Sequence, residues 1–147
     1  MERKTAARET AARETAARET AARETAARET AARETAALKA KGVALKVFGA
    51  GSAEMNGYYK REGEINGKPH FRKLNANFEI DTHYQISIFW IHHPYDASSW
   101  IFYADDAWTA SVPYDVYNTQ SDTPLPPLSG WGQCGRGEAP CPTLVFL

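Results

Sequence analysis

The pattern of apolar and polar positions divides the chain into two parts near residue 42. In the first part the pentapeptide TAARE recurs, and Met1 and Leu38 are the large apolar residues. From Val43 onward, short apolar runs alternate with Gly and Pro, and this second part holds all 4 Trp, 7 Tyr and 6 Phe. We therefore expect a repeat segment at residues 1–42 and a small aromatic-rich β domain at residues 43–147.

The repeat predicts one long α-helix. Ala, Arg and Glu favour helix strongly enough to outweigh the threonines over residues 2–40. Most Glu residues also precede an Arg by four positions, as Glu14 precedes Arg18, and such a pair stabilises an isolated helix by about 0.2–0.5 kcal/mol. Five residues turn a helix by about 500°, or about 140° beyond one full turn, so no residue type stays on one face. Because a coiled coil needs a constant apolar face, we expect a solitary helix.

The helix is expected to end at Gly42, which can serve as the C′ residue. Lys39 and Lys41 complement the C-terminal end of the helix dipole. At about 1.5 Å per residue, the predicted helix is about 58 Å long. Three other interpretations remain open: a disordered low-complexity tract, a designed spacer, and an Arg-rich arm for nucleic acid. The last is disfavoured because nearly every Arg is matched by a Glu.

Period-two patterns and turn dipeptides predict strands in the second part. Asn66-Gly67 lies between residues 58–65 and 68–73, an arrangement typical of a hairpin with a tight turn. Residues 84–91, YQISIFWI, carry apolar side chains on both faces, which indicates a central, well-covered strand. One face of this strand comprises Tyr84, Ile86, Ile88 and Trp90.

Three further strands are expected. Residues 100–104, WIFYA, can return antiparallel beside residues 84–91, and YDVY at 114–117 and TLVFL at 143–147 are later candidates. The predicted fold class is α+β, with a long solitary N-terminal α-helix followed by a small, mainly antiparallel β domain.

An ordered series of motifs resembles a short aromatic β module that recurs in multidomain proteins of algae and other protists. The motifs are NGYYKREGEINGKPHFRK, then Trp90 and Trp100, then SDTPLPPLSGW and APCPTL, over about residues 47–145. The resemblance implies an accessory unit that stands beside varied partners, and it implies no particular activity.

Charge is nearly balanced over the whole chain, with a net charge of -1. Residues 1–42 carry a net charge of +3 and the remainder carries -4, so the globular part has no electrostatic footprint for nucleic acid. The chain shows neither the apolar core of a secretory signal nor a run long enough to span a bilayer. We expect a soluble, intracellular protein.

Catalytic and cofactor motifs are not found. Residues 49–57, GAGSAEMNG, have Glu54 where a dinucleotide-binding loop needs its third Gly, so this stretch predicts a turn. Neither G-x-S-x-G nor a Walker sequence is present, and Asp105-Asp106 is typical of a solvated turn. We therefore expect no catalytic residue and no cofactor.

Metal binding is also disfavoured by spacing, and we expect no metal. The possible ligands match no common zinc pattern and are His70, His83, His92, His93, Cys134 and Cys141. In a reducing compartment both cysteines stay thiols, whereas in a secreted protein they could close a short loop.

Residues 123–128, TPLPPL, contain a PxxP arrangement that SH3 or WW domains can bind. The favoured alternative is that this stretch folds back across the sheet with Leu125, Leu128 and Trp131 as anchors. Tryptophans are more often core than ligand platforms, and Trp90 is predicted to be core. The candidate binding residues are a surface aromatic cluster: Trp100, Tyr103, Trp108, Tyr114, Tyr117 and Trp131.

The sequence favours a non-enzymatic interaction or scaffold protein, in which the β domain docks a protein partner or larger assembly and the helix serves as a strut. The alternative is a module that binds a carbohydrate or peptide in an exposed aromatic groove. A small hydrolase ranks third. A concave pocket with an exposed Trp and convergent polar groups would favour the ligand-binding alternative, whereas a scaffold predicts a co-purifying protein.

Overall fold

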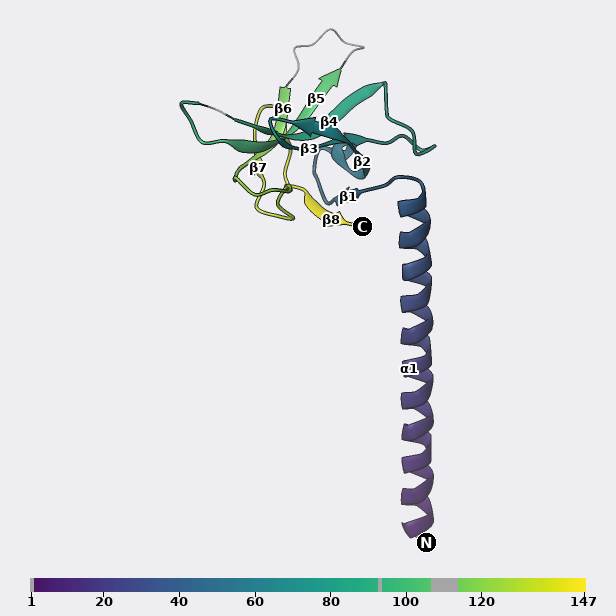
Figure 1. Cartoon of the computed structure of the whole chain (residues 1–147). Coiled ribbons are helices and arrows are strands. Elements are labelled where there is room, and N and C mark those ends of the chain that lie inside the picture. The colour runs from purple at the N-terminus through teal and green to yellow at the C-terminus, as the bar shows by residue number, and fades with distance from the viewer. Residues whose placement is uncertain (1, 93, 107–113) are drawn as a thin grey trace. The chain divides into compact units, whose positions relative to one another are not determined.

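The computed structural model describes residues 2–92, 94–106 and 114–147 (Figure 1). The chain divides into two compact units, Met1–Ala37 and Leu38–Leu147. The last turn of the helix therefore belongs to the second unit, and the division falls a few residues before the predicted boundary at residue 42. The described part is one long helix followed by an eight-stranded antiparallel curled sheet, which confirms the α+β class.

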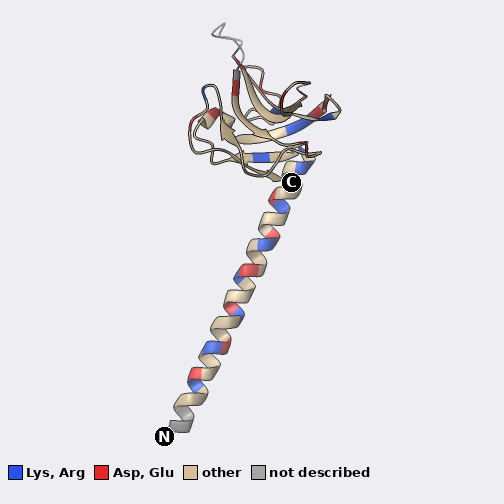
Figure 2. Cartoon of the chain, turned by 90° about the vertical axis from the view of Figure 1, so that its left-hand side faces the viewer, with Lys and Arg blue, Asp and Glu red and all other residues tan. Residues whose placement is uncertain are grey.

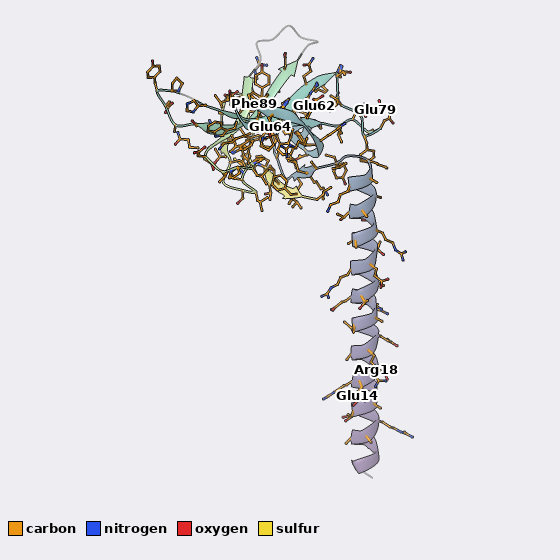
Figure 3. The ribbon with its side chains drawn as sticks, viewed as in Figure 1. Glu14, Arg18, Glu62, Glu64, Glu79 and Phe89 are labelled. Carbon is orange, nitrogen blue, oxygen red and sulfur yellow. The ribbon has the colours of Figure 1, made fainter. Side chains whose placement is uncertain are left out.

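Helix α1 spans Glu2–Ala40, as the repeat predicts. Every residue from Thr5 to Glu34 is exposed, and Figure 2 shows acidic and basic positions interspersed along the helix. The predicted ion pairs do not form among the helix side chains that the structure describes, the labelled Glu14 and Arg18 included (Figure 3). Five threonine hydroxyls instead donate to the carbonyl four residues earlier, as Thr10 does to Ala6 at 3.0 Å. The helix thus relies on its backbone and on high intrinsic propensity.

A Schellman motif ends the helix, which confirms the stop at Gly42. The N–H of Val43 donates to the carbonyl of Leu38 at 3.1 Å, and the N–H of Gly42 donates to that of Lys39 at 2.9 Å. Gly42 has a φ of 82°, a conformation that costs glycine little.

The sheet has the strand order β7-β6-β5-β4-β3-β2-β1-β8, so the chain winds back and forth from β1 to β7 and then returns beside β1. The strands are β1 (Leu45–Phe48), β2 (Gly57–Ile65), β3 (Lys68–Lys73), β4 (Tyr84–Ile91), β5 (Ser99–Asp106), β6 (Tyr114–Gln120), β7 (Gly132–Gln133) and β8 (Thr143–Phe146). A short 3-10 helix, η1 (Ala53–Met55), lies between β1 and β2. One face of the curled sheet encloses a core to which β1–β6 and β8 contribute.

The predicted hairpins are confirmed. Asn66 and Gly67 have φ values of 53° and 79° and join β2 to β3, as a tight turn of positive φ requires. Strand β5 returns antiparallel beside β4, with Trp90 opposite Trp100. Asp105 and Asp106 are the last residues of β5, so the prediction that they form a turn is wrong.

Candidate ligand-binding hollow

An open hollow of about 410 Å³ lies at one end of strands β4, β5 and β6. Its lining comprises Trp90, His92, Ala97, Ser98, Gln120, Ser121 and Asp122, and we call it the Trp90 hollow. Strand register brings these residues together, because Ile91 pairs with Ser99 and Ser99 pairs with Gln120. Residues just beyond these positions therefore meet at the same end of these three strands.

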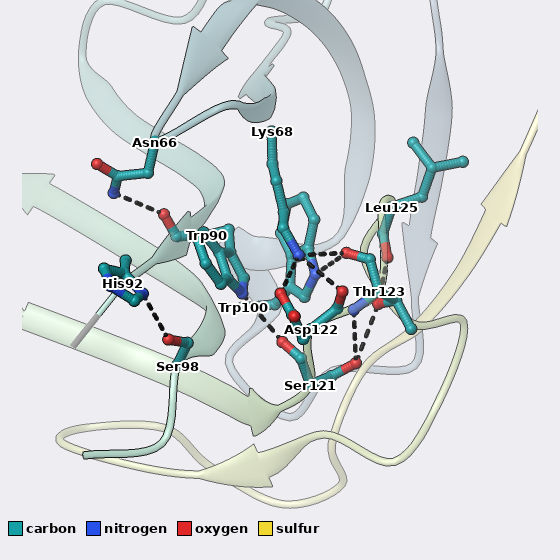
Figure 4. Close-up of polar contacts among 10 residues, drawn as sticks. All are labelled: Asn66, Lys68, Trp90, His92, Ser98, Trp100, Ser121, Asp122, Thr123 and Leu125. Atoms are coloured by element: carbon teal, nitrogen blue, oxygen red, sulfur yellow. Dashed lines mark hydrogen bonds and ion pairs between the residues drawn. The ribbon is translucent and has the colours of Figure 1, made fainter. Parts of the chain in front are cut away.

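Trp90 forms the rigid wall of the hollow. Its indole N–H donates to the carbonyl of Ser121 at 3.0 Å, and its own carbonyl accepts from the side-chain amide of Asn66 at 3.0 Å. The ring lies between His92, stacked at 5.6 Å, and the Lys68 ammonium, which is 4.0 Å from the ring centroid (Figure 4). Trp90 is only 8% exposed, which confirms the prediction that it is a core residue.

The ammonium of Lys68 uses its hydrogen-bond donors within its own domain. Its ammonium donates to the Asp122 carboxylate at 2.6 Å, to the Asp122 carbonyl at 2.8 Å and to the Thr123 carbonyl at 3.0 Å. An ammonium has three N–H donors, so these contacts use all of them. The Asp122 side chain is 84% exposed, and its Oδ2 has no hydrogen-bond partner among the described residues. The ion pair thus presents a carboxylate oxygen to the hollow while remaining neutral overall.

His92 is the exposed ring of the hollow. Its Nδ1 lies 3.1 Å from the hydroxyl oxygen of Ser98, and one face of the imidazole packs on Trp90. These two contacts orient the ring, and His92 as a whole is exposed. The ring is therefore held in position before any ligand arrives.

Three indoles hold the proline-rich segment that follows β6. Beside the bond from Trp90 to Ser121, the indole N–H of Trp100 donates to the Thr123 carbonyl at 3.1 Å and that of Trp131 donates to the Pro127 carbonyl at 2.9 Å. The segment therefore folds back onto the domain, as the favoured alternative predicts.

Two of the predicted anchors of this segment are wrong. Leu125 and Leu128 are 45% and 54% exposed, whereas Pro126 and Trp131 are buried. The leucines are not needed as anchors because the indole hydrogen bonds already tie the carbonyls of the segment to the core.

Three of the six predicted binding residues lie in the core rather than on the surface. Trp100, Tyr117 and Trp131 belong to the buried core, so their side chains offer no surface to a partner. The Tyr117 hydroxyl accepts from the N–H of Ser52 at 3.0 Å and donates to the carbonyl of Glu138. These contacts give Tyr117 a structural role between distant loops.

Tyr103 lies half-buried on β5, with its ring 5.7 Å from that of Phe89. Tyr114 begins β6, and Trp108 lies outside the described residues. Sequence reasoning missed His92, Ser98, Gln120 and Asp122 as site residues. The sequence pointed to these residues only through the predicted pairing of β4 with β5, which places both ends of the connecting loop at one end of the two strands.

A second hollow of about 370 Å³ is lined by Gly51, Ser52, Ala53, Glu54, Arg136 and Glu138. Its polar groups serve mainly to join two loops: the hydroxyl oxygen of Ser52 accepts from the N–H of Glu138, and the N–H of Gly51 donates to the Pro140 carbonyl. We interpret this hollow as a by-product of loop packing.

The cysteines are half-buried free thiols. Burial, with a smaller contribution from Asp115, raises the pKa of Cys134 to about 11. The thiol therefore stays protonated near neutral pH, which disfavours nucleophilic chemistry. Within the part of the chain that the structure describes, no three His, Cys, Asp or Glu residues gather as metal ligands would. In that same part, no helix combines the length and the apolar character that a membrane span needs.

Comparison with known protein families, curated proteins and solved structures found no match. The resemblance to the algal and protist module remains a prediction from motifs, and the geometry of the hollow must support any functional argument by itself.

Proposed function

We propose that this chain is a non-enzymatic binding protein whose β domain takes a ligand or partner in the Trp90 hollow. The observation that carries the proposal is the convergence of an oriented imidazole, an exposed carboxylate and two hydroxyl-bearing serines on one open concavity. Small-molecule sites commonly combine an aromatic wall with a few placed polar groups in a cavity of about 300–1,000 Å³.

Preorganisation favours binding at this place. Trp90 is fixed on both faces and through its indole N–H, and the backbone of Ser121 and Asp122 is tied to Trp90 and Lys68. A ligand would therefore meet walls whose side-chain and backbone entropy is already lost in the free protein. Such a site holds its ligand without a moving lid.

The repeat helix supports a second part of the proposal, a spacer. Exposed positions extend from Thr5 to Glu34 without a buried side, so this stretch offers no apolar stripe for docking. Spin labels at positions 10 and 30 should lie about 30 Å apart along the axis, and insertion of one TAARE unit between them should add about 7.5 Å. A broad distribution of distances unaffected by the insertion would contradict a rigid spacer.

The binding function can be tested with two probe sets, a library of displayed 12-residue peptides and an array of defined oligosaccharides. We expect a selected probe to shift the NMR resonances of the hollow, above all the indole N–H of Trp90, and mass spectrometry to recover it unchanged. Failure of every probe to bind, shifts confined to other surfaces, or conversion of the probe into a product would each contradict the proposal.

A further inference from the structure

We infer that the ligand of the Trp90 hollow is a neutral saccharide, an inference that rests on the proposed binding function and names its ligand class. The site comprises one exposed ring, one carboxylate, one amide and two hydroxyls, contributed by His92, Asp122, Gln120, Ser98 and Ser121. Three properties of these groups favour a neutral polyhydroxy compound as the ligand: their charge, their hydrogen-bonding capacity and their arrangement around the ring.

Charge argues against an anionic ligand. The ammonium of Lys68 lies next to the hollow, but its three N–H donors are taken by Asp122 and Thr123. An incoming phosphate, sulfate or carboxylate would meet the exposed Asp122 carboxylate and would have to displace it from Lys68. A ligand without charge avoids both the repulsion and the cost of breaking the ion pair.

Hydrogen-bonding capacity matches neighbouring hydroxyl groups. Oδ2 of Asp122 can accept, and the exposed Gln120 amide can both donate and accept. The Ser121 hydroxyl already donates to Thr123, because the Thr123 hydroxyl donates to the Leu125 carbonyl, and the Ser98 hydroxyl is bonded to His92. Each serine oxygen can still accept a hydrogen bond. A sugar hydroxyl likewise donates one hydrogen bond and accepts others. A row of adjacent hydroxyls can therefore satisfy these groups in pairs.

Shape favours a sugar ring over a peptide chain. The imidazole of His92 is backed by Trp90 on one face, so its other face is a small fixed platform for the C–H face of a pyranose. The usual modes of peptide recognition use a sheet edge, a groove for a helix or an aromatic groove for a polyproline segment. The Trp90 hollow is instead a single open depression at one end of β4, β5 and β6.

The test uses the full chain and isothermal titration with neutral hexasaccharides: maltohexaose, cellohexaose, mannohexaose and chitohexaose. Heparin hexasaccharide serves as the anionic probe, and a peptide from the displayed library serves as the alternative ligand. We expect at least one neutral hexasaccharide to bind and to shift the Trp90 indole resonance, and the heparin fragment to bind at least tenfold more weakly.

Matched variants connect binding to the hollow. Gln120→Ala and His92→Ala should each weaken binding of the neutral sugar at least tenfold. Gln85→Ala should leave it unchanged, because Gln85 is also exposed on a strand but lies near the opposite end of β4, about 23 Å from His92 at about 3.3 Å per residue. Circular dichroism of all three variants should match that of the parent chain, since the altered side chains are exposed.

The outcomes separate this inference from the proposed function. If no neutral sugar binds, or if both hollow variants bind as the parent does, the saccharide inference is wrong. If a peptide alone shifts the hollow resonances and loses affinity in His92→Ala, the inference fails while the binding function stands. If every bound probe maps outside the hollow, both fail.

Discussion

Replacing Trp90 by alanine should destabilise the β domain by about 3–5 kcal/mol, the usual cost of removing a large aromatic side chain from a core. Trp90 is 8% exposed and shares the core face of β4 with Ile86 and Ile88. Its indole N–H also bonds to Ser121, and a typical hydrogen bond contributes about 0.5–1.5 kcal/mol. Because a domain of this size is stable by only about 5–15 kcal/mol, such a loss can unfold a large fraction of molecules.

Trp90→Phe separates the two contributions. Phenylalanine keeps most of the apolar volume but has no N–H for the Ser121 carbonyl, so we expect a smaller loss of about 1–2 kcal/mol. Tyr95→Ala is the control, because Tyr95 is 100% exposed and its removal should change stability by less than about 0.5 kcal/mol.

Urea denaturation followed by far-UV circular dichroism measures these differences without using tryptophan fluorescence, which the substitutions themselves change. Equal m-values would show that the same surface is exposed on unfolding in each protein. A free energy of unfolding for Trp90→Ala within about 1 kcal/mol of the parent value would refute the assignment of Trp90 as a core residue. A Phe variant as unstable as the Ala variant would instead place the stabilisation in the hydrogen bond.

Three other predictions follow from the structure. Gly51→Ala should cost at least about 2 kcal/mol in urea denaturation, because its Cβ would lie 2.1 Å from the Ala139 carbonyl oxygen. Gly49→Ala, which meets open space at a φ of 75°, should cost about 1 kcal/mol, and equal costs for the two variants would contradict this packing. Burial raises the pKa of Cys134 from 9.0 to about 11, so at pH 8 this thiol should react with iodoacetamide about 100-fold more slowly in the folded chain than in urea. The stability that the protonated thiol contributes should be lost as pH rises from 9.0 to about 11. Deleting residues 1–37 should leave a cooperative unfolding transition with an unchanged midpoint, since none of the residues described there belongs to the core. A lost transition would show that the repeat belongs to the fold.

Local rules were sufficient for much of the fold. The dipeptide Asn66-Gly67 predicts a hairpin because few other residues tolerate two successive positive φ angles, and the structure has both. Gly42 predicts the end of the helix for the same reason. Apolar side chains on both faces of residues 84–91 indicated a central strand, and β4 does lie between β3 and β5.

The hollow could not be predicted from such rules. It depends on the register of β4, β5 and β6, which places His92, Ser98 and Gln120 at one end of these strands. It also depends on the ion pair between Lys68 and Asp122, which are 54 positions apart in the sequence. Neither the alternation of apolar residues nor any turn dipeptide encodes which strand ends coincide. The predicted ion pairs of the helix failed for another reason: exposed Glu and Arg gain little from pairing and keep their rotamer freedom in water.

The tryptophans illustrate why composition alone misplaced several binding residues. A buried indole needs an acceptor for its N–H, and a proline-rich segment outside helix and strand presents carbonyls that its own prolines cannot pair. In this chain Trp90, Trp100 and Trp131 meet that segment at Ser121, Thr123 and Pro127. The tryptophans therefore supply the donors, and the segment that contains TPLPPL supplies the acceptors, of one set of hydrogen bonds. Since these bonds also fix the backbone of Ser121 and Asp122, the feature that buries the tryptophans is the one that shapes the hollow.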